Sequence, residues 1–165
     1  MGPELLAFEM GVHVVEDRLP KGWLGAYHHG SRTVTLAPGL NLDPVRYRCV
    51  LGHELGHAHY GHTPDDYPEG EWAADKFAAK LLIRLDDYLE AMAATGDVVA
   101  AARVLGVLPW VVRAFQKTMN GGLFTRTGLG LLAPAPFAEP GSGLVCPPDA
   151  SVLGGGELVM VGGVA

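Results

Sequence analysis

Alternating apolar and polar residues near the start of the chain predict three short β-strands, over residues 12–17, 23–27 and 32–37. Turn-forming residues separate them, Leu-Pro-Lys-Gly before the second strand and His28-His29-Gly30-Ser31 before the third. The second and third strands are therefore expected to form a hairpin.

Helical spacing of apolar residues follows the strands and continues to about residue 119. The first helix is predicted over 44–60, because Asp43 is a good N-cap, Pro44 suits the first helical position and Gly61 can end the helix. Four further helices are predicted over residues 69–83, 85–94, 98–105 and 109–119.

The composition changes at residue 121, where the chain becomes rich in glycine and proline and keeps one basic residue, Arg126. Such a segment has little apolar surface to offset the entropy lost on ordering, so 121–165 is expected to be a disordered tail. A β-hairpin around Gly154-Gly155-Gly156 is the alternative. The whole pattern predicts an α+β domain over 1–120, with a small antiparallel sheet packed on the helices at 44–60 and 69–83.

Bulk properties narrow the class of protein. The chain has 165 residues and a net charge of −6, which argues against a protein that coats nucleic acid through a broad basic surface. The longest apolar run, 98–112, is interrupted by Arg103 and Pro109, so no membrane-spanning segment is expected. The first residues lack the basic start and apolar stretch of a signal peptide, so secretion is not expected. Cys49 and Cys146 form no CxxC pair, so a reduced, cytoplasmic location is expected.

The stretch His53-Glu54-Leu55-Gly56-His57 is an HExxH pattern on the predicted helix over 44–60. Side chains four residues apart on a helix lie one above the other, so His53 and His57 can reach one metal ion. Glu54, next to the first ligand, can hold a water molecule and take its proton. The pattern therefore predicts one Zn²⁺ per chain, with Glu54 as the catalytic residue.

A catalytic zinc ion needs a third protein ligand. The metzincin pattern HExxHxxGxxH would place its glycine at Tyr60 and its histidine at Thr63, so it does not fit. Glu71 and Asp75 share one face of the helix over 69–83, as glutamate-type zincins place a zinc ligand and a partner for a ligand histidine. Glu69 is the rival ligand, and the alternative for Glu71 and Asp75 is a pair of solvated charges.

The run RYRCVLGHELGHAHYGH followed by EGEWAADKFAAKLL resembles the ImmA/IrrE family of zinc metallopeptidases. The resemblance covers roughly residues 10–120 and implies a metalloendopeptidase that cleaves a helix-turn-helix repressor and so derepresses mobile-element, phage or stress-response genes. The chain departs from the family at Ile83-Arg84, where members often have Met-Pro. His62 matches a frequent family position and is expected to cap the helix or to reach an oxyanion. The matching residues are Arg48, His53, Glu54, His57, Gly61, His62, Glu71, Ala74, Asp75, Phe77, Ala78, Leu81 and Leu82.

Residues 98–119 resemble a helix-turn-helix unit, with glycine in the turn and small or apolar residues on the inner sides of both helices. Any tight helical hairpin requires the same kinds of residue, so the pattern is not specific. Only Arg113 and Lys117 could meet a phosphate backbone, so this pair is expected to present Trp110 and Val111 to a substrate protein. A purely structural helical pair and a contact with DNA through 98–119 are the alternatives. Two other functions stay open: a non-catalytic zinc-containing transcriptional regulator, and a toxin-like protein that binds a repressor without cutting it. An intact Glu54 argues against both, since structural zinc needs no base.

Overall fold

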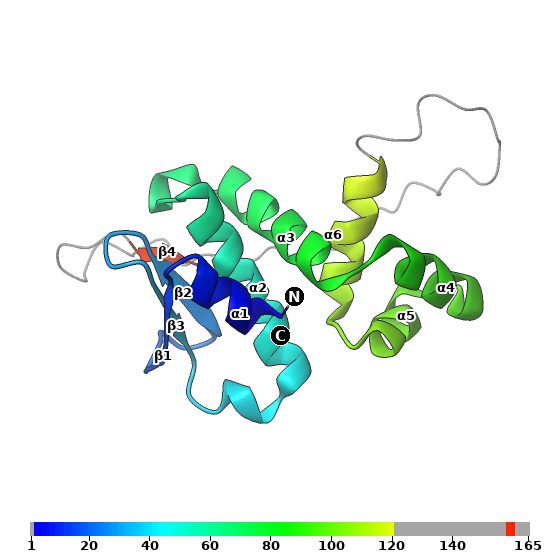
Figure 1. Ribbon diagram of the computed structural model, residues 1–165, viewed down its shortest axis with the longest axis horizontal. Coiled ribbons are helices and arrows are strands. Elements are labelled where there is room, and N and C mark those ends of the chain that lie inside the picture. Colours follow the sequence, from blue (N-terminus) through cyan, green and yellow to red (C-terminus); the bar gives the residue numbers. More distant parts are fainter. Residues whose placement is uncertain (1, 121–157, 161–165) are drawn as a thin grey trace.

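The computed structural model describes residues 2–120 and 158–160. These residues form an α+β fold, in which a small sheet lies on one side of a long central helix and most other helices lie on the opposite side (Figure 1). The predicted fold class is confirmed.

The helices of the described residues lie where the sequence places them, with one exception. Five of them begin and end within one residue of the prediction, whereas α1 was not predicted. This helix has seven residues, and no side chain caps its N-terminus. The helices are α1 (Pro3–Glu9), α2 (Pro44–Tyr60), α3 (Glu69–Leu82), α4 (Leu85–Thr95), α5 (Val98–Leu105) and α6 (Pro109–Asn120), with short 3-10 turns η1 (Leu40–Leu42) and η2 (Pro64–Asp66) before α2 and α3.

The central helix α2 is fixed at both ends by the predicted residues. The Asp43 carboxylate accepts a hydrogen bond from the Arg46 backbone N–H at 3.0 Å, and Gly61 ends the helix with a φ of 68°, in the left-handed region that suits glycine. Between these caps, every residue from 49 to 58 is buried. A helix buried all round must have partners on every side.

The sheet has the strand order β1-β3-β2-β4. Strands β2 (Gly25–His28) and β3 (Thr33–Leu36) form the predicted antiparallel hairpin, and β4 (Leu158–Met160) pairs antiparallel with β2. Strand β1 (His13–Glu16), however, runs parallel to β3, so the sheet is mixed and the prediction of a wholly antiparallel sheet is wrong in this respect. The cause is the connection over residues 17–24, which carries the chain past the position of β3 before β2 begins.

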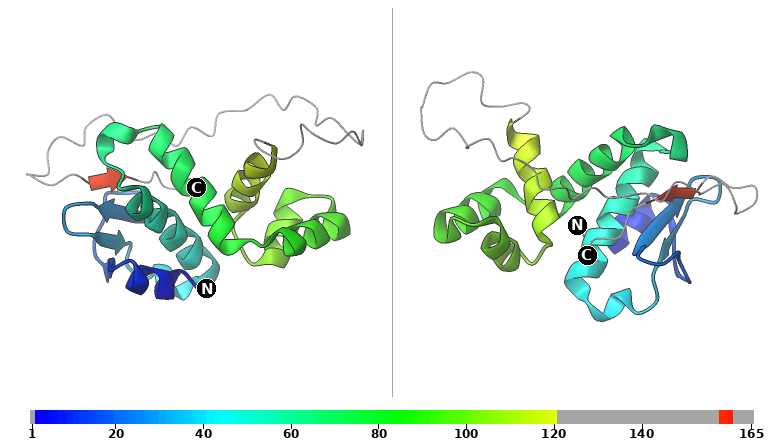
Figure 2. Two further views of the ribbon diagram at one scale, coloured as in Figure 1. Left: turned by 45° about the horizontal axis from the view of Figure 1, so that its top comes forward. Right: turned by 180° about the vertical axis from the view of Figure 1, so that it is seen from behind.

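The predicted tail over 121–165 is described only at β4. Its three residues pair with β2, with Val159 opposite Tyr27 (Figure 2). The remaining residues of the predicted tail lie outside the described ranges, and so does the turn of the alternative hairpin at Gly154-Gly155-Gly156.

Two apolar cores hold α2 in place. The first lies between the sheet, α1 and one side of α2, and it includes Tyr27, Val34, Leu36, Leu51 and Leu55. The second lies on the other side of α2, among α3 to α6, and it includes Cys49, Ala79, Tyr88, Val112 and Phe115. Because both cores pack against α2, the position of this helix and of its side chains is fixed from two sides.

Helices α5 and α6 meet at an angle of 104°. No single helix in the described part of the chain has both the length and the apolar character needed to cross a bilayer; α5 and α6 satisfy that test only when taken together as a bent pair.

Candidate metal centre

Three potential metal ligands meet between α2 and α3. His53 and His57 lie one turn apart on α2 and face Glu71 on α3. The two Nε2 atoms are 3.0 Å apart, and each lies 3.4 Å from a Glu71 oxygen: His53 from Oε2 and His57 from Oε1. Donor atoms around one tetrahedral ion with bonds of ~2.1 Å lie roughly 3.4 Å apart. The three side chains therefore fit a shared metal ion, and they are the group predicted from the sequence.

Each of the two imidazoles has a second partner on its other ring nitrogen. The Nδ1 atom of His53 lies 2.9 Å from Oδ1 of Asp75, and the Nδ1 atom of His57 lies 3.1 Å from Nδ1 of His62. Such outer partners fix the tautomer and the ring orientation of metal-binding histidines. Asp75 thus makes the predicted contact. The backbone N–H of His62 donates to the carbonyl oxygen of His57 at 3.0 Å, which is the expected helix-capping contact, and the His62 ring lies against the His57 ring as well.

Burial and neighbouring charges set opposite protonation states for the two histidines. Burial lowers the pKa of His53, but hydrogen bonds with Asp75 and Glu71 outweigh this effect and raise it to about 10. Burial, together with His53 and His62, lowers the pKa of His57 to about 2. At neutral pH His53 is therefore the protonated imidazole of the pair and His57 the neutral one, and a metal ion must displace a proton from His53 to bind.

Glu54 is fully buried beside this group. Neither of its carboxyl oxygens has a hydrogen-bond partner among the described residues. Burial raises the pKa of Glu54 to about 8, with His53 acting to lower it and Glu71 to raise it further. A buried carboxyl group without a partner is destabilising, and such groups are concentrated at functional sites.

The close approach of α3 to α2 depends on small residues. A Cβ atom added at Gly56 would lie 2.7 Å from Cα of Ala74, so the two helices touch through their backbones at this point. Ala74 lies between Glu71 and Asp75 on α3. The contact between Gly56 and Ala74 therefore brings both carboxylates within reach of the histidines.

Helix α6, the second helix of the bent pair α5–α6, also reaches the metal centre. Trp110, in the first turn of α6, packs edge-to-face with His53, with ring centroids 5.9 Å apart. The neighbouring Val111 is fully buried, so the expectation that it is presented to a partner protein is wrong. Arg113 and Lys117 are exposed on α6.

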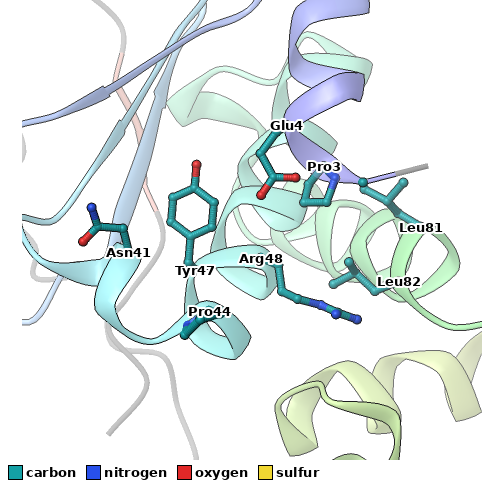
Figure 3. A pocket seen from close by; sticks show the side chains of 9 residues that line it. Pro3, Glu4, Asn41, Pro44, Tyr47, Arg48, Leu81 and Leu82 are labelled. Carbon is teal, nitrogen blue, oxygen red and sulfur yellow. The ribbon is translucent and has the colours of Figure 1, made fainter.

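Other side chains considered from the sequence lie away from the three ligands. Glu69 is exposed at the first residue of α3, and His59 is exposed on α2. Arg48 lines a separate pocket of about 440 Å³ between α1, α2 and α3, near Glu4, Tyr47 and other residues that take no part in the metal centre (Figure 3). Glu71 is therefore the carboxylate that joins the histidines.

Sequence reasoning did not identify Gly25, although it lies at the site. Gly25 is buried at the start of β2, and the nearest atom to a Cβ added there is Oε1 of Glu54. A glycine inside a strand often marks the close approach of another group, and this signal was available.

Comparisons with known proteins agree with this geometry. The profile of a peptidase family described as the IrrE N-terminal-like domain matches residues 7–114, a span that includes the three ligands, Glu54 and Asp75. Neither the search of curated proteins nor the search of solved structures gave a match.

Proposed function

Because the chain belongs to the IrrE N-terminal-like family of peptidases, we propose that it is a zinc-dependent endopeptidase. One observation carries the proposal: a fully buried, partnerless carboxyl group, Glu54, lies beside a His53–His57–Glu71 group with the spacing of metal ligands. A structural zinc site has no use for such a group, whereas peptide hydrolysis requires one.

The donor set suits zinc. Two imidazoles and one carboxylate are the ligands of a common class of catalytic zinc site, and they leave a fourth position open. Zinc, when bound, would polarise the carbonyl group of the scissile bond and acidify a water molecule. Asp75 holds the His53 ring through Nδ1, and His62 contacts the His57 ring in the same way.

Glu54 acts as general base and then as general acid. It accepts a proton from the water molecule that attacks the scissile carbonyl carbon, and it passes that proton to the nitrogen of the departing amine. Before a metal ion binds, burial raises the pKa of the Glu54 carboxyl group, which makes it a stronger base than an exposed carboxylate. Its buried position also excludes bulk water from the proton transfer.

The test uses Glu54→Gln as the discriminating variant. Wild-type protein loaded with zinc should cleave unstructured peptides, detected by mass spectrometry, and a chelator should abolish the cleavage. Glu54→Gln should bind zinc as wild type does and lose cleavage, because the amide has nearly the same shape but cannot accept the proton. If the wild type binds zinc and cuts no peptide, the protein is a non-catalytic regulator or binding protein instead. If Glu54→Gln cuts as fast as the wild type, Glu54 is not the general base.

The substrate we propose is a helix-turn-helix repressor, as the resemblance to the ImmA/IrrE family implies. Recognition of a folded repressor would use surface near the metal centre, and Trp110 on α6 contacts His53 directly. Binding to DNA through residues 98–119 is disfavoured, because much of α6 is buried and its exposed basic residues are Arg113 and Lys117.

Two measurements test this substrate. Arg113→Glu, which leaves the buried side of α6 unchanged, should slow cleavage of a folded helix-turn-helix repressor much more than cleavage of a short peptide spanning its cut site. Gel-shift assays at physiological salt should show no DNA binding by the wild type. Sub-micromolar DNA binding that Arg113→Glu abolishes would contradict this part of the proposal.

A further inference from the structure

Gly25 makes room for the Glu54 carboxyl group. A Cβ atom added at Gly25 would lie 2.4 Å from Oε1 and 3.0 Å from Cδ of Glu54, and 2.7 Å from Cγ1 of Val50. Carbon atoms in van der Waals contact are normally about 3.5–4.0 Å apart, so the added methyl group cannot be accommodated without movement. Gly25 is not among the glycines with positive φ, so its backbone conformation is open to other residues. The requirement for glycine comes from these two neighbours.

Glu54 has little freedom to move away from β2. It is fully buried on a helix with an apolar core on each side. Its carboxyl group is close enough to interact electrostatically with His53 and Glu71. A methyl group at position 25 would displace the Glu54 carboxyl group by about an ångström and so change its position relative to the three metal ligands.

We propose that Gly25 is a positioning residue for Glu54: the missing side chain on β2 fixes where the carboxyl group lies relative to the metal ligands. The inference rests on the proposed function. Gly25 has no side chain of its own, so it acts through Glu54. A displacement of about 1 Å in a catalytic group can slow a reaction by on the order of 100-fold.

The primary test is Gly25→Ala in the full-length, zinc-loaded protein. We expect kcat to fall by on the order of 100-fold. Zinc affinity should stay close to that of the wild type, because the atoms nearest the added methyl group belong to Glu54 and Val50 and not to His53, His57 or Glu71. The matched control is Gly52→Ala, also next to the site on α2, where the added Cβ atom would lie at ordinary distances of 3.5 Å from Leu82 and 3.6 Å from Ala78. This control should bind zinc and cleave peptide as the wild type does.

A Glu54→Asp background separates a positioning role from general damage to β2. Aspartate is shorter by one methylene group, so its carboxyl group withdraws from the methyl group at position 25. Glu54→Asp alone should lower kcat, but adding Gly25→Ala to it should cause less than about a threefold further loss. The same cycle can be followed without activity, by thermal unfolding in the presence of a chelator. There Gly25→Ala should lower the midpoint much more in the protein that retains Glu54 than in the Glu54→Asp protein.

The outcomes are distinguishable. Equal effects of Gly25→Ala in the two backgrounds, on kcat and on the unfolding midpoint, would overturn the positioning role and indicate a clash with Val50 alone. Unchanged kcat in Gly25→Ala would overturn it as well. A zinc-loaded wild type that cleaves no peptide would instead refute the proposed function, and the unfolding cycle would still show whether residues 25 and 54 are in contact.

Discussion

Gly56→Ala should separate α3 from α2 and so weaken metal binding without touching a ligand. The added Cβ atom would lie 2.7 Å from Cα, 3.0 Å from Cβ and 3.0 Å from the carbonyl oxygen of Ala74. Two of these atoms belong to the backbone of α3, so no side-chain rotation can relieve the overlap. The helices themselves must move apart.

The size of the movement follows from the contact distances. Restoring an ordinary separation of about 3.8 Å from 2.7 Å requires roughly 1 Å of displacement at Ala74. Glu71 lies one turn earlier on the same helix, so its carboxylate should withdraw by a similar distance from His53 and His57. Metal–ligand bonds tolerate only about 0.2 Å of error. We therefore expect zinc affinity to fall by at least the ~10–100-fold that follows from the loss of a ligand's outer partner.

The assay is competition for zinc against a chromophoric chelator, with Gly52→Ala as the control. Replacing glycine by alanine inside a helix is intrinsically stabilising by about 1 kcal/mol, and both variants receive this gain. In Gly52→Ala the added methyl group fits, so stability should rise or stay level. In Gly56→Ala, overpacking of ~1–3 kcal/mol should exceed the gain, so thermal unfolding should shift to a lower temperature.

One result would refute this reasoning. If Gly56→Ala binds zinc as tightly as wild type while Glu71→Ala does not, α3 can hold Glu71 in place without the close contact at Ala74. The same variant with a higher unfolding midpoint than wild type would show that a Cβ atom at position 56 has more room than its distance of 2.7 Å from Cα of Ala74 implies.

Three further predictions concern single groups. Asp75→Asn should lower zinc affinity about 10–100-fold, because the amide cannot support the His53 ring as the carboxylate does; unchanged affinity in a chelator competition would contradict this. Zinc affinity should rise with pH across the neutral range, because hydrogen bonds with Asp75 and Glu71 outweigh the effect of burial and raise the pKa of His53, whose proton a metal ion must displace. Calorimetry in buffers of different ionisation enthalpy should then detect proton release near pH 7, and its absence would count against the assignment. Burial raises the pKa of Cys49 to about 11, so this thiol should react slowly in the folded protein. In a Cys146→Ser variant, iodoacetamide at pH 7.5 should label Cys49 only after denaturation. Rapid labelling of the folded protein would contradict the burial of Cys49.

Local signals made the helices predictable. The ends of α2 follow from Asp43 and Gly61, whose own side chain and backbone conformation form the caps, so no tertiary information was needed. The spacing of His53 and His57 works in the same way, because one helical turn sets it. Helix α1 was missed because its short sequence has no side-chain cap and its formation depends on packing against α2 and β1.

Long-range contacts were the part that the sequence could not supply. The parallel pairing of β1 with β3 depends on where the chain goes between residues 17 and 24, which strand propensities do not determine. The contact between Trp110 and His53 joins residues far apart in the chain. A glycine in a strand can mark a bulge, a bend or the close approach of another group. The role of Gly25 is therefore recognisable only when the positions of β2 and α2 are known.

Strand β4 changes what the outer edge of β2 can do. Residues 158–160 pair with residues 26–28, directly after the glycine that lies against Glu54. An extended peptide that added to the same edge would need backbone groups that β4 already engages, so the two segments would compete. Because β4 belongs to the same chain, it competes at an effective concentration that dilution of the protein does not change. A peptide's apparent affinity for this edge would therefore be its intrinsic affinity reduced by the fraction of time for which β4 leaves the edge free.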